Sequence, residues 1–159
     1  MAYILDQQRE QDCTGAFQAY RSYLTSAAGN FPPSAYALAT SDWYFDPADH
    51  RCPHDSRLKT CTITERSPRK GLPPSIKIRL LSVREDGVHE FDYPQAYQFR
   101  LSYVGNQQGH KDWRYDEFRL NENNQVVHEI EWRGDEDTGS WLIEASDVIY
   151  TWIPKRKSS

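Results

Sequence analysis

The sequence predicts an α+β domain in which one or two N-terminal helices pack on about six antiparallel strands. Apolar residues recur at three- and four-residue intervals near the N-terminus, and they alternate with polar residues from about residue 75 onward. Polar turn-forming clusters separate the alternating segments. We expect one domain over residues 1–159, divided into a helical and loop part (1–57), an antiparallel β meander (58–153) and a basic tail (154–159).

The first helix is expected over about residues 14–28. Thr14 can cap its start, and Gly29-Asn30 can end it, because both residues tolerate the left-handed conformation. Ser34 can cap a short second helix over residues 35–40. We expect the apolar stripe of the first helix to pack on the sheet, and it consists of Ala16, Phe17, Tyr20, Tyr23, Leu24 and Ala27.

Residues 41–57 are expected to form a loop, because Asp46-Pro47 and Cys52-Pro53 are turn signals. The last strand, at about 141–153, is apolar on both faces, which is typical of a strand buried on both sides. We expect the other strands at 58–65, 76–80, 88–93 and 97–103, and in the two arms of a hairpin spanning 110–133.

Two architectures accommodate these elements. A calycin-like up-and-down barrel would close the sheet around an interior cavity. A cone-like, curved open sheet would instead wrap over the helices and leave a pocket between helix and sheet. The N-terminal helix followed by long aromatic strands favours the open, cone-like sheet.

Composition argues against several classes of function. The net charge is −4, and charges of both signs are interspersed along the chain, whereas a nucleic-acid-binding protein needs a concentrated basic surface. No run approaches the roughly 18 apolar residues of a membrane span. The N-terminus turns polar after five residues, so we expect no signal peptide, and three cysteines then indicate reduced thiols and a cytoplasmic location.

The hairpin His110–Arg133 carries the strongest candidate site, and its meaning depends on strand register. With a four-residue loop, Asn121–Asn124, Glu117 faces His128 and orients its ring as in a general acid or base. With a three- or five-residue loop, Phe118 faces His128 instead, so His128 becomes a core residue and Glu117 a surface charge. We favour this second register. The ligand-binding face in the first register comprises Trp113, Tyr115, Glu117, Arg119, His128 and Trp132.

A second cluster contains residue types that bind zinc. Imidazole and thiolate groups could close a tetrahedral site, but the spacing matches no standard zinc motif and C-x-x-C is absent. A polar loop with one buried thiol is the favoured alternative, and a Cys52–Cys61 disulfide is another. We expect no other cofactor, and no recognisable catalytic motif decides whether the chain is an enzyme. The candidate zinc ligands are His50, Cys52, His54 and Cys61.

Two hypotheses for function follow. In the first, the domain binds a small aromatic or amphipathic ligand in a pocket lined by aromatic strands, to which Tyr97 and Tyr103 also contribute. In the second, the domain is a non-enzymatic interaction module that binds a protein partner or forms a homo-oligomer. We favour ligand binding, because the strand charges are interleaved with aromatic residues.

Overall fold

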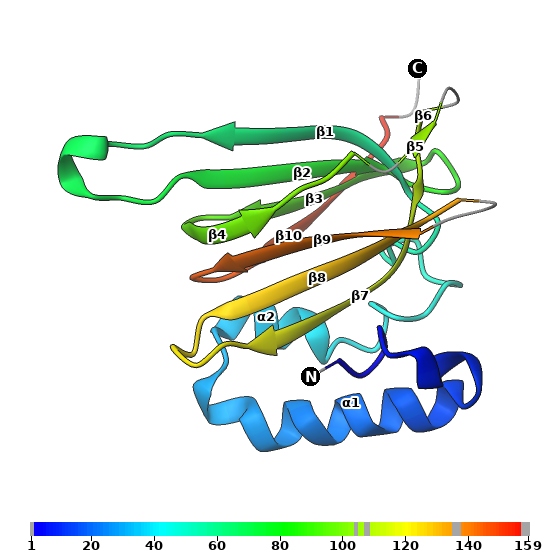
Figure 1. Cartoon of the computed structure of the whole chain (residues 1–159). Helices are drawn as coiled ribbons and strands as arrows, with labels where there is room; N and C mark the ends of the chain where they lie inside the picture. Colours follow the sequence, from blue (N-terminus) through cyan, green and yellow to red (C-terminus); the bar gives the residue numbers. More distant parts are fainter. Residues whose placement is uncertain (1, 104, 107–108, 135–137, 157–159) are drawn as a thin grey trace.

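Two four-stranded antiparallel sheets face each other in the computed structural model of the chain, and helices lie along one side of the pair (Figure 1). The structure describes residues 2–103, 105–106, 109–134 and 138–156. The last three residues of the expected basic tail, 157–159, lie outside this range. Within it, the helices are α1 (Cys13–Ala27), α2 (Pro33–Ala39) and three short 3₁₀ helices at Gln7–Glu10, Ala28–Asn30 and Pro68–Lys70.

The chain builds most of one sheet, crosses to the other, and returns. The first sheet has the order β1 (Arg57–Thr64), β2 (Ser75–Leu81), β3 (Gly87–Tyr93) and β10 (Ile149–Pro154). The second sheet has the order β4 (Ala96–Arg100), β9 (Thr138–Ala145), β8 (Val126–Arg133) and β7 (Asp112–Leu120). The short strands β5 (Gly105–Asn106) and β6 (Gly109–His110) form a separate pair.

The predicted α+β class with an open sheet is therefore confirmed. The described strands do not close into a barrel, so the calycin-like alternative is not formed. The prediction of a single sheet was too simple, because the meander divides between two sheets.

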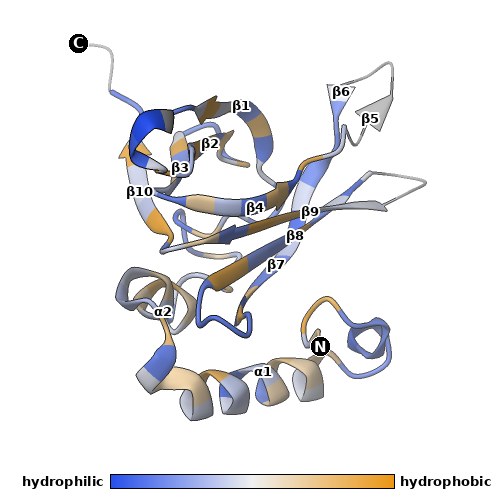
Figure 2. Cartoon of the chain, turned by 60° about the vertical axis from the view of Figure 1, so that its left-hand side comes forward, coloured by the Kyte–Doolittle hydropathy of each residue, from blue (hydrophilic) through white to orange (hydrophobic). Residues whose placement is uncertain are grey.

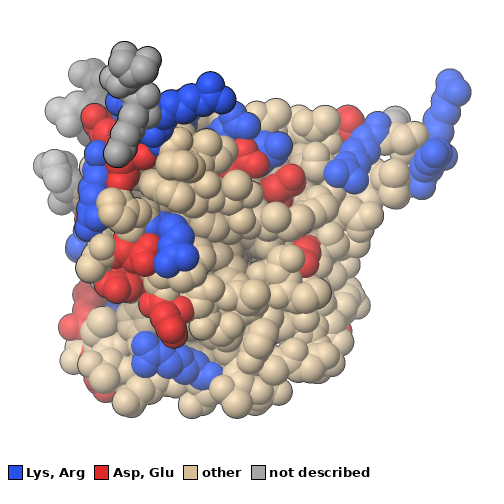
Figure 3. Space-filling view, turned by 180° about the vertical axis from the view of Figure 1, so that it is seen from behind, with Lys and Arg blue, Asp and Glu red and all other residues tan. Residues whose placement is uncertain are grey.

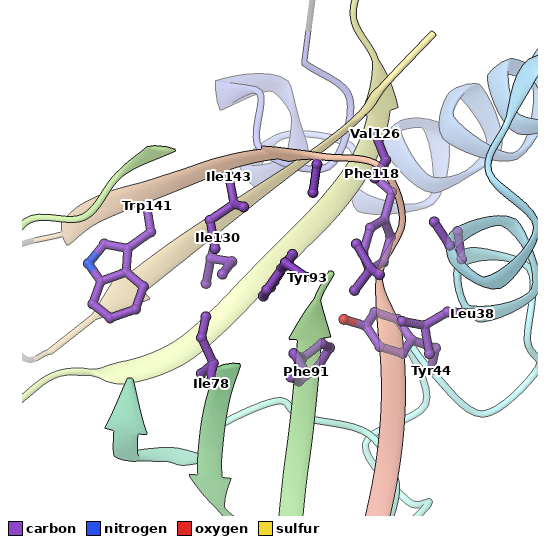
Figure 4. Close-up of a cluster of buried hydrophobic side chains, with 14 of the residues drawn as sticks. Leu38, Tyr44, Ile78, Phe91, Tyr93, Phe118, Val126, Ile130, Trp141 and Ile143 are labelled. Carbon is purple, nitrogen blue, oxygen red and sulfur yellow. The ribbon is translucent and has the colours of Figure 1, made fainter. Parts of the chain in front are cut away.

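The core lies between the two sheets, where alternate side chains of each strand point inward. Ile76, Ile78 and Leu80 of β2 are buried, as the alternation in the sequence predicts. Phe91 of β3 stacks on Trp113 of β7 across the interface, with ring centroids 4.9 Å apart. Figure 4 shows Tyr93 projecting among the aliphatic side chains of the opposite sheet. Large aromatic side chains thus fill the space that few aliphatic residues leave.

Helix α1 lies alongside β7, which is an edge strand of its sheet (Figures 1 and 2). The Tyr20 hydroxyl donates to the Phe118 carbonyl oxygen at 2.9 Å and accepts from the Phe118 amide at 2.7 Å. The Tyr23 hydroxyl accepts from the Leu120 amide at 2.8 Å. An exposed strand edge would leave such backbone groups unpaired. The tyrosines on the apolar face of α1 therefore supply hydrogen-bond partners to the β7 backbone in addition to packing against it.

Side chains other than those predicted cap the two helices. Asp12, and not Thr14, caps α1, and its carboxylate accepts from the Gly15 amide. The start of α2 is capped by Asp147, whose carboxylate accepts from the Ser34 and Ala35 amides at 3.2 and 2.8 Å. The expected cap at Ser34 is therefore wrong.

The predicted last strand is two strands. Residues 146–148 break it between β9 and β10, which belong to different sheets. Trp141 and Ile143 of β9 are buried, whereas Ile149 of β10 is 44% exposed and does not share their face. The predicted strand is apolar on both faces because its two halves, β9 and β10, lie in different sheets and each buries its own set of side chains.

Candidate functional site

The hairpin between β7 and β8 adopts the register in which Phe118 pairs with His128. The Asn121 amide donates to the Gln125 carbonyl at 3.0 Å, so the loop between them has three residues. Asn124 occupies the left-handed region with φ 57°, as the last residue of such loops usually does. The register with a four-residue loop is wrong, because Glu117 pairs with Glu129.

A β-bulge near the start of β7 decides which side chains reach the core. Trp113 pairs with Trp132 and Tyr115 pairs with Glu131, so Arg114 is the extra residue. The bulge changes the alternation of side chains, and Trp113 and Asp116 therefore both point inward and are buried. A regular strand would have placed Asp116 and Trp113 on opposite faces.

Asp116 is the centre of a buried hydrogen-bonded network. Its Oδ2 lies 2.5 Å from the Tyr44 hydroxyl and 2.7 Å from Nε2 of His128. Its Oδ1 accepts from Nε1 of Trp113 at 3.1 Å. Nδ1 of His128 lies 2.6 Å from the Tyr93 hydroxyl. At most 2% of any of these five residues is exposed to solvent.

One assignment of protons satisfies every contact of this network. Nε2–H of His128 donates to Asp116, which leaves Nδ1 to accept from the Tyr93 hydroxyl. Asp116 then receives three hydrogen bonds, and such donors stabilise the ionised carboxylate. Burial raises the pKa of Tyr44 and of Tyr93 well above the ordinary value, so both phenols keep the protons that they donate.

A pocket of about 210 Å³ lies on the outer side of this network. Asp116, Tyr44 and Trp113 form part of its wall, and it is bounded by α1, the loop 41–56 and β7. A neighbouring groove of about 560 Å³ shares three of its lining residues, Phe17, Phe45 and Pro47. The other residues that line the smaller pocket are Cys13, Cys52, Pro53, His54, Arg114 and Tyr115.

Five of the twelve described residues that line the pocket are aromatic, and five others, the two cysteines, His54, Arg114 and Asp116, carry ionisable groups. Burial raises the pKa of Cys52 to about 12, so this side chain is a neutral thiol. His54 Nδ1 lies 2.6 Å from the Arg114 carbonyl oxygen, to which it donates, and the Arg114 guanidinium pairs with Asp55 at 2.9 Å. Asp116 is the one carboxylate among the described residues that line this pocket, and its imidazole partner, His128, lies 2.7 Å away.

Three of the predicted ligand-binding residues point away from the pocket's carboxylate, onto the outer face of the hairpin. Glu117 is fully buried there, and its carboxylate accepts from the Tyr3 amide at 3.1 Å and the Leu5 amide at 2.8 Å. Arg119 Nη1 lies 3.1 Å from Glu117 Oε2. Glu117 is therefore neither a partner of His128 nor a surface charge, but an anchor for the N-terminal segment. Tyr115 shares this face and also reaches the pocket rim.

The structure distributes the remaining predicted ligand-binding residues over several places. His128, Trp113 and Trp132 are all in the core. Tyr97 is 45% exposed on β4, and Tyr103, which lies beyond the end of that strand, is 70% exposed. The pocket therefore contains Trp113 and Tyr115 of the predicted set but neither Tyr97 nor Tyr103.

The four candidate zinc ligands lie in different environments. His50 contacts Asp86 at the surface, Cys52 is buried, and His54 is bound to the Arg114 carbonyl. Cys61 lies in β1 opposite Ile78, and all three cysteines are free thiols. Within the part of the chain that the structure describes, no three His, Cys, Asp or Glu side chains are grouped to hold a metal ion. Zinc binding stays a prediction that these positions do not support.

Comparison with known proteins gave no match to a family model, a curated protein or a solved structure. Among the described residues, no helix has the length and apolar character needed to cross a membrane.

Sequence reasoning missed Tyr44, Tyr93 and Asp116 as members of the site. Asp116 lies in the hairpin, between aromatic residues of the sequence, but the face of the sheet to which its side chain points depends on the bulge at Arg114. Tyr44 and Tyr93 come from a loop and from the opposite sheet, and no local pattern connects them to His128.

Proposed function

We propose that this domain binds a small aromatic molecule in the pocket beside Asp116. The supporting observation is a buried carboxylate that accepts three hydrogen bonds and forms part of the wall of a pocket to which five aromatic side chains contribute. Desolvating a charged group is costly, and an apolar core of the same volume is often at least as stable. A carboxylate at this position therefore favours a role in binding over one in stability.

The size of the pocket limits the ligand to about one or two rings. A cavity of roughly 150 Å³ accepts benzene, and this pocket has about 210 Å³. Phe17, Phe45 and Tyr115, which are partly exposed, supply aromatic surfaces against which a planar ring would pack. A larger amphipathic ligand would extend into the neighbouring groove, which shares Phe17 and Phe45.

The distribution of hydrogen bonds on Asp116 indicates which polar group the ligand carries. Oδ2 receives two donors, whereas Oδ1 receives Trp113 Nε1 alone, at 3.1 Å. A carboxylate oxygen can accept a further hydrogen bond. The pocket thus favours a ring that bears a hydroxyl or N–H donor over the same ring without one.

Matched probes test this proposal. We would titrate isotope-labelled protein with phenol and toluene, 2-naphthol and naphthalene, and indole and indene, and follow the amide resonances by NMR. The donor-bearing member of each pair should shift the Trp113 and Tyr115 resonances and bind about ten times more tightly than its partner. Equal binding within the pairs, or shifts confined to other parts of the protein, would contradict the proposal.

Alkylation of Cys13 provides an independent control for the location. Cys13 is exposed and lines the pocket, so its N-ethylmaleimide adduct should obstruct the entrance. The alkylated protein should keep its melting temperature and lose binding of 2-naphthol. Unchanged 2-naphthol binding after complete alkylation would place the ligand elsewhere.

A further inference from the structure

One hairpin of this acidic chain carries a large local excess of positive charge. Residues 57–79 carry seven Lys or Arg side chains and one Glu, a net charge of +6, in a chain whose total is −4. The rest of the chain therefore carries −10. The expectation of interspersed charge is wrong for this stretch. The charged residues of the hairpin are Arg57, Lys59, Glu65, Arg66, Arg69, Lys70, Lys77 and Arg79.

The hairpin consists of β1, β2 and the loop between them, which projects beyond the two sheets (Figure 1). Figure 3 shows Lys and Arg side chains extending from the corresponding side of the molecule, at the right of that view. Lys59, Arg66, Arg69 and Lys70 are exposed, and none of them takes part in an ion pair of the described residues. These four positive charges are thus available to a partner.

The same hairpin contains a strand with one free edge. β1 is at the edge of its sheet and pairs with β2 on one side only. A bulge at Lys59 interrupts the pairing, but Thr60–Thr64 pair with β2 without a further shift. The free edge of such a segment carries backbone donors and acceptors in the arrangement that a further strand requires.

Apolar side chains beside this edge are incompletely covered. Ile63 pairs with the buried Ile76 and so points to the core side of the sheet, yet 47% of it is exposed. Leu72 in the loop is 37% exposed. An added strand with apolar residues at alternate positions would cover Ile63.

We propose that the free edge of β1 binds an extended acidic polypeptide segment as an additional strand, with the basic loop contacting its carboxylates. Two copies of this chain paired through β1 would bring together two hairpins that each have a net charge of +6. The repulsion between them disfavours self-association at this edge. Residues 57–79 contain no aromatic side chain on which a nucleic-acid base could stack. The combination of strand edge and basic loop therefore favours an acidic peptide.

A fluorescein-labelled octapeptide of alternating Glu and Val serves as the probe, with the Gln-Val octapeptide and oligo(dT) as comparisons. The Glu peptide should bind at least about ten times more tightly than either, and raising NaCl from about 50 mM to about 500 mM should weaken it. Substituting Arg66, Arg69 and Lys70 together by Ala should weaken binding about tenfold. Lys155→Ala with Arg156→Ala, which removes exposed basic residues outside the hairpin, should not.

Amide hydrogen exchange distinguishes strand addition from charge attraction alone. Every second amide of Thr60–Thr64 should exchange more slowly in the presence of the Glu peptide, because alternate residues direct their N–H groups to the free edge. Unchanged exchange in β1, binding of oligo(dT) as tight as that of the peptide, or a homodimer in light scattering that excludes the peptide would each overturn the proposal.

Discussion

Replacing Asp116 by Asn tests whether the network holds an ionised carboxylate. Three donors converge on Asp116, from Tyr44, Trp113 and His128. Asn supplies one acceptor oxygen and one NH₂ group, which donates. If the Asn oxygen faces Tyr44 and His128, its NH₂ group meets the Trp113 N–H, and two donors oppose each other at about the 3.1 Å of the present bond.

The expected cost follows from the bonds that change. The substitution removes one buried hydrogen bond, leaves a buried N–H unpaired, and weakens two charge-assisted bonds, for a total of about 2–4 kcal/mol. For a domain of this size that corresponds to a fall in Tm of roughly 5–15 °C. The matched control is Asp92→Asn on the outer face of β3, which should change stability by less than about 0.5 kcal/mol.

Urea denaturation followed by tryptophan fluorescence would measure both variants, with thermal unfolding by circular dichroism as a second readout. If Asp116→Asn is as stable as the Asp92 control, or more stable than the parent protein, the three donors do not act on a carboxylate. Asp116 would then be protonated in the folded protein, because Asn can replace a protonated Asp without losing a hydrogen bond.

Three further predictions concern other parts of the molecule. Burial raises the pKa of Cys52 to about 12 and also raises that of Cys61. N-ethylmaleimide at neutral pH should therefore add once, at the exposed Cys13. Early addition at Cys52, seen by mass spectrometry, would contradict this prediction. Tyr20→Phe should destabilise the fold by about 1–3 kcal/mol in urea titration, because the edge of β7 loses a donor and an acceptor; a neutral effect would show that water replaces the hydroxyl. Burial lowers the pKa of His89 from 6.5 to about 4, so the unfolded state binds the proton first as pH falls. Stability should therefore decrease between about pH 6.5 and pH 4, by up to about 3 kcal/mol, and His89→Gln should remove this dependence; an equal pH dependence in the variant would refute it.

Local patterns predicted the elements that depend on local physics. The apolar stripe of α1 has helical spacing because one face packs, and Cys13–Ala27 agrees closely with the expected 14–28. The alternation in β2 and β3 predicted their buried residues, since each strand has one face in the core. Hairpin register was also accessible, because Asn124 suits the left-handed position of a three-residue loop.

Features that depend on distant contacts could not be predicted. The break at 146–148 places Asp147 where it caps α2, which is a tertiary requirement with no trace in strand periodicity. Glu117 is buried because the N-terminal segment folds over it.

The candidate site was the least predictable part. Its acid depends on a bulge, and the tyrosines around it come from residues 44 and 93, far from the hairpin in sequence. Sequence reasoning therefore found His128 but offered it a carboxylate partner, Glu117, only in the register that was not favoured, whereas the geometry makes Asp116 its partner.

The ratio of two dissociation constants shows whether Asp116 recognises a hydrogen-bond donor on an aromatic ligand. We would measure Kd for 2-naphthol and for naphthalene by NMR titration of the parent protein and of Asp116→Asn at a temperature where both are folded. If Asp116 accepts a hydrogen bond from the ligand, the parent should prefer 2-naphthol by about tenfold, and the variant should lose this preference while its affinity for naphthalene is unchanged. An equal preference for 2-naphthol in both proteins would mean that Asp116 does not recognise the donor.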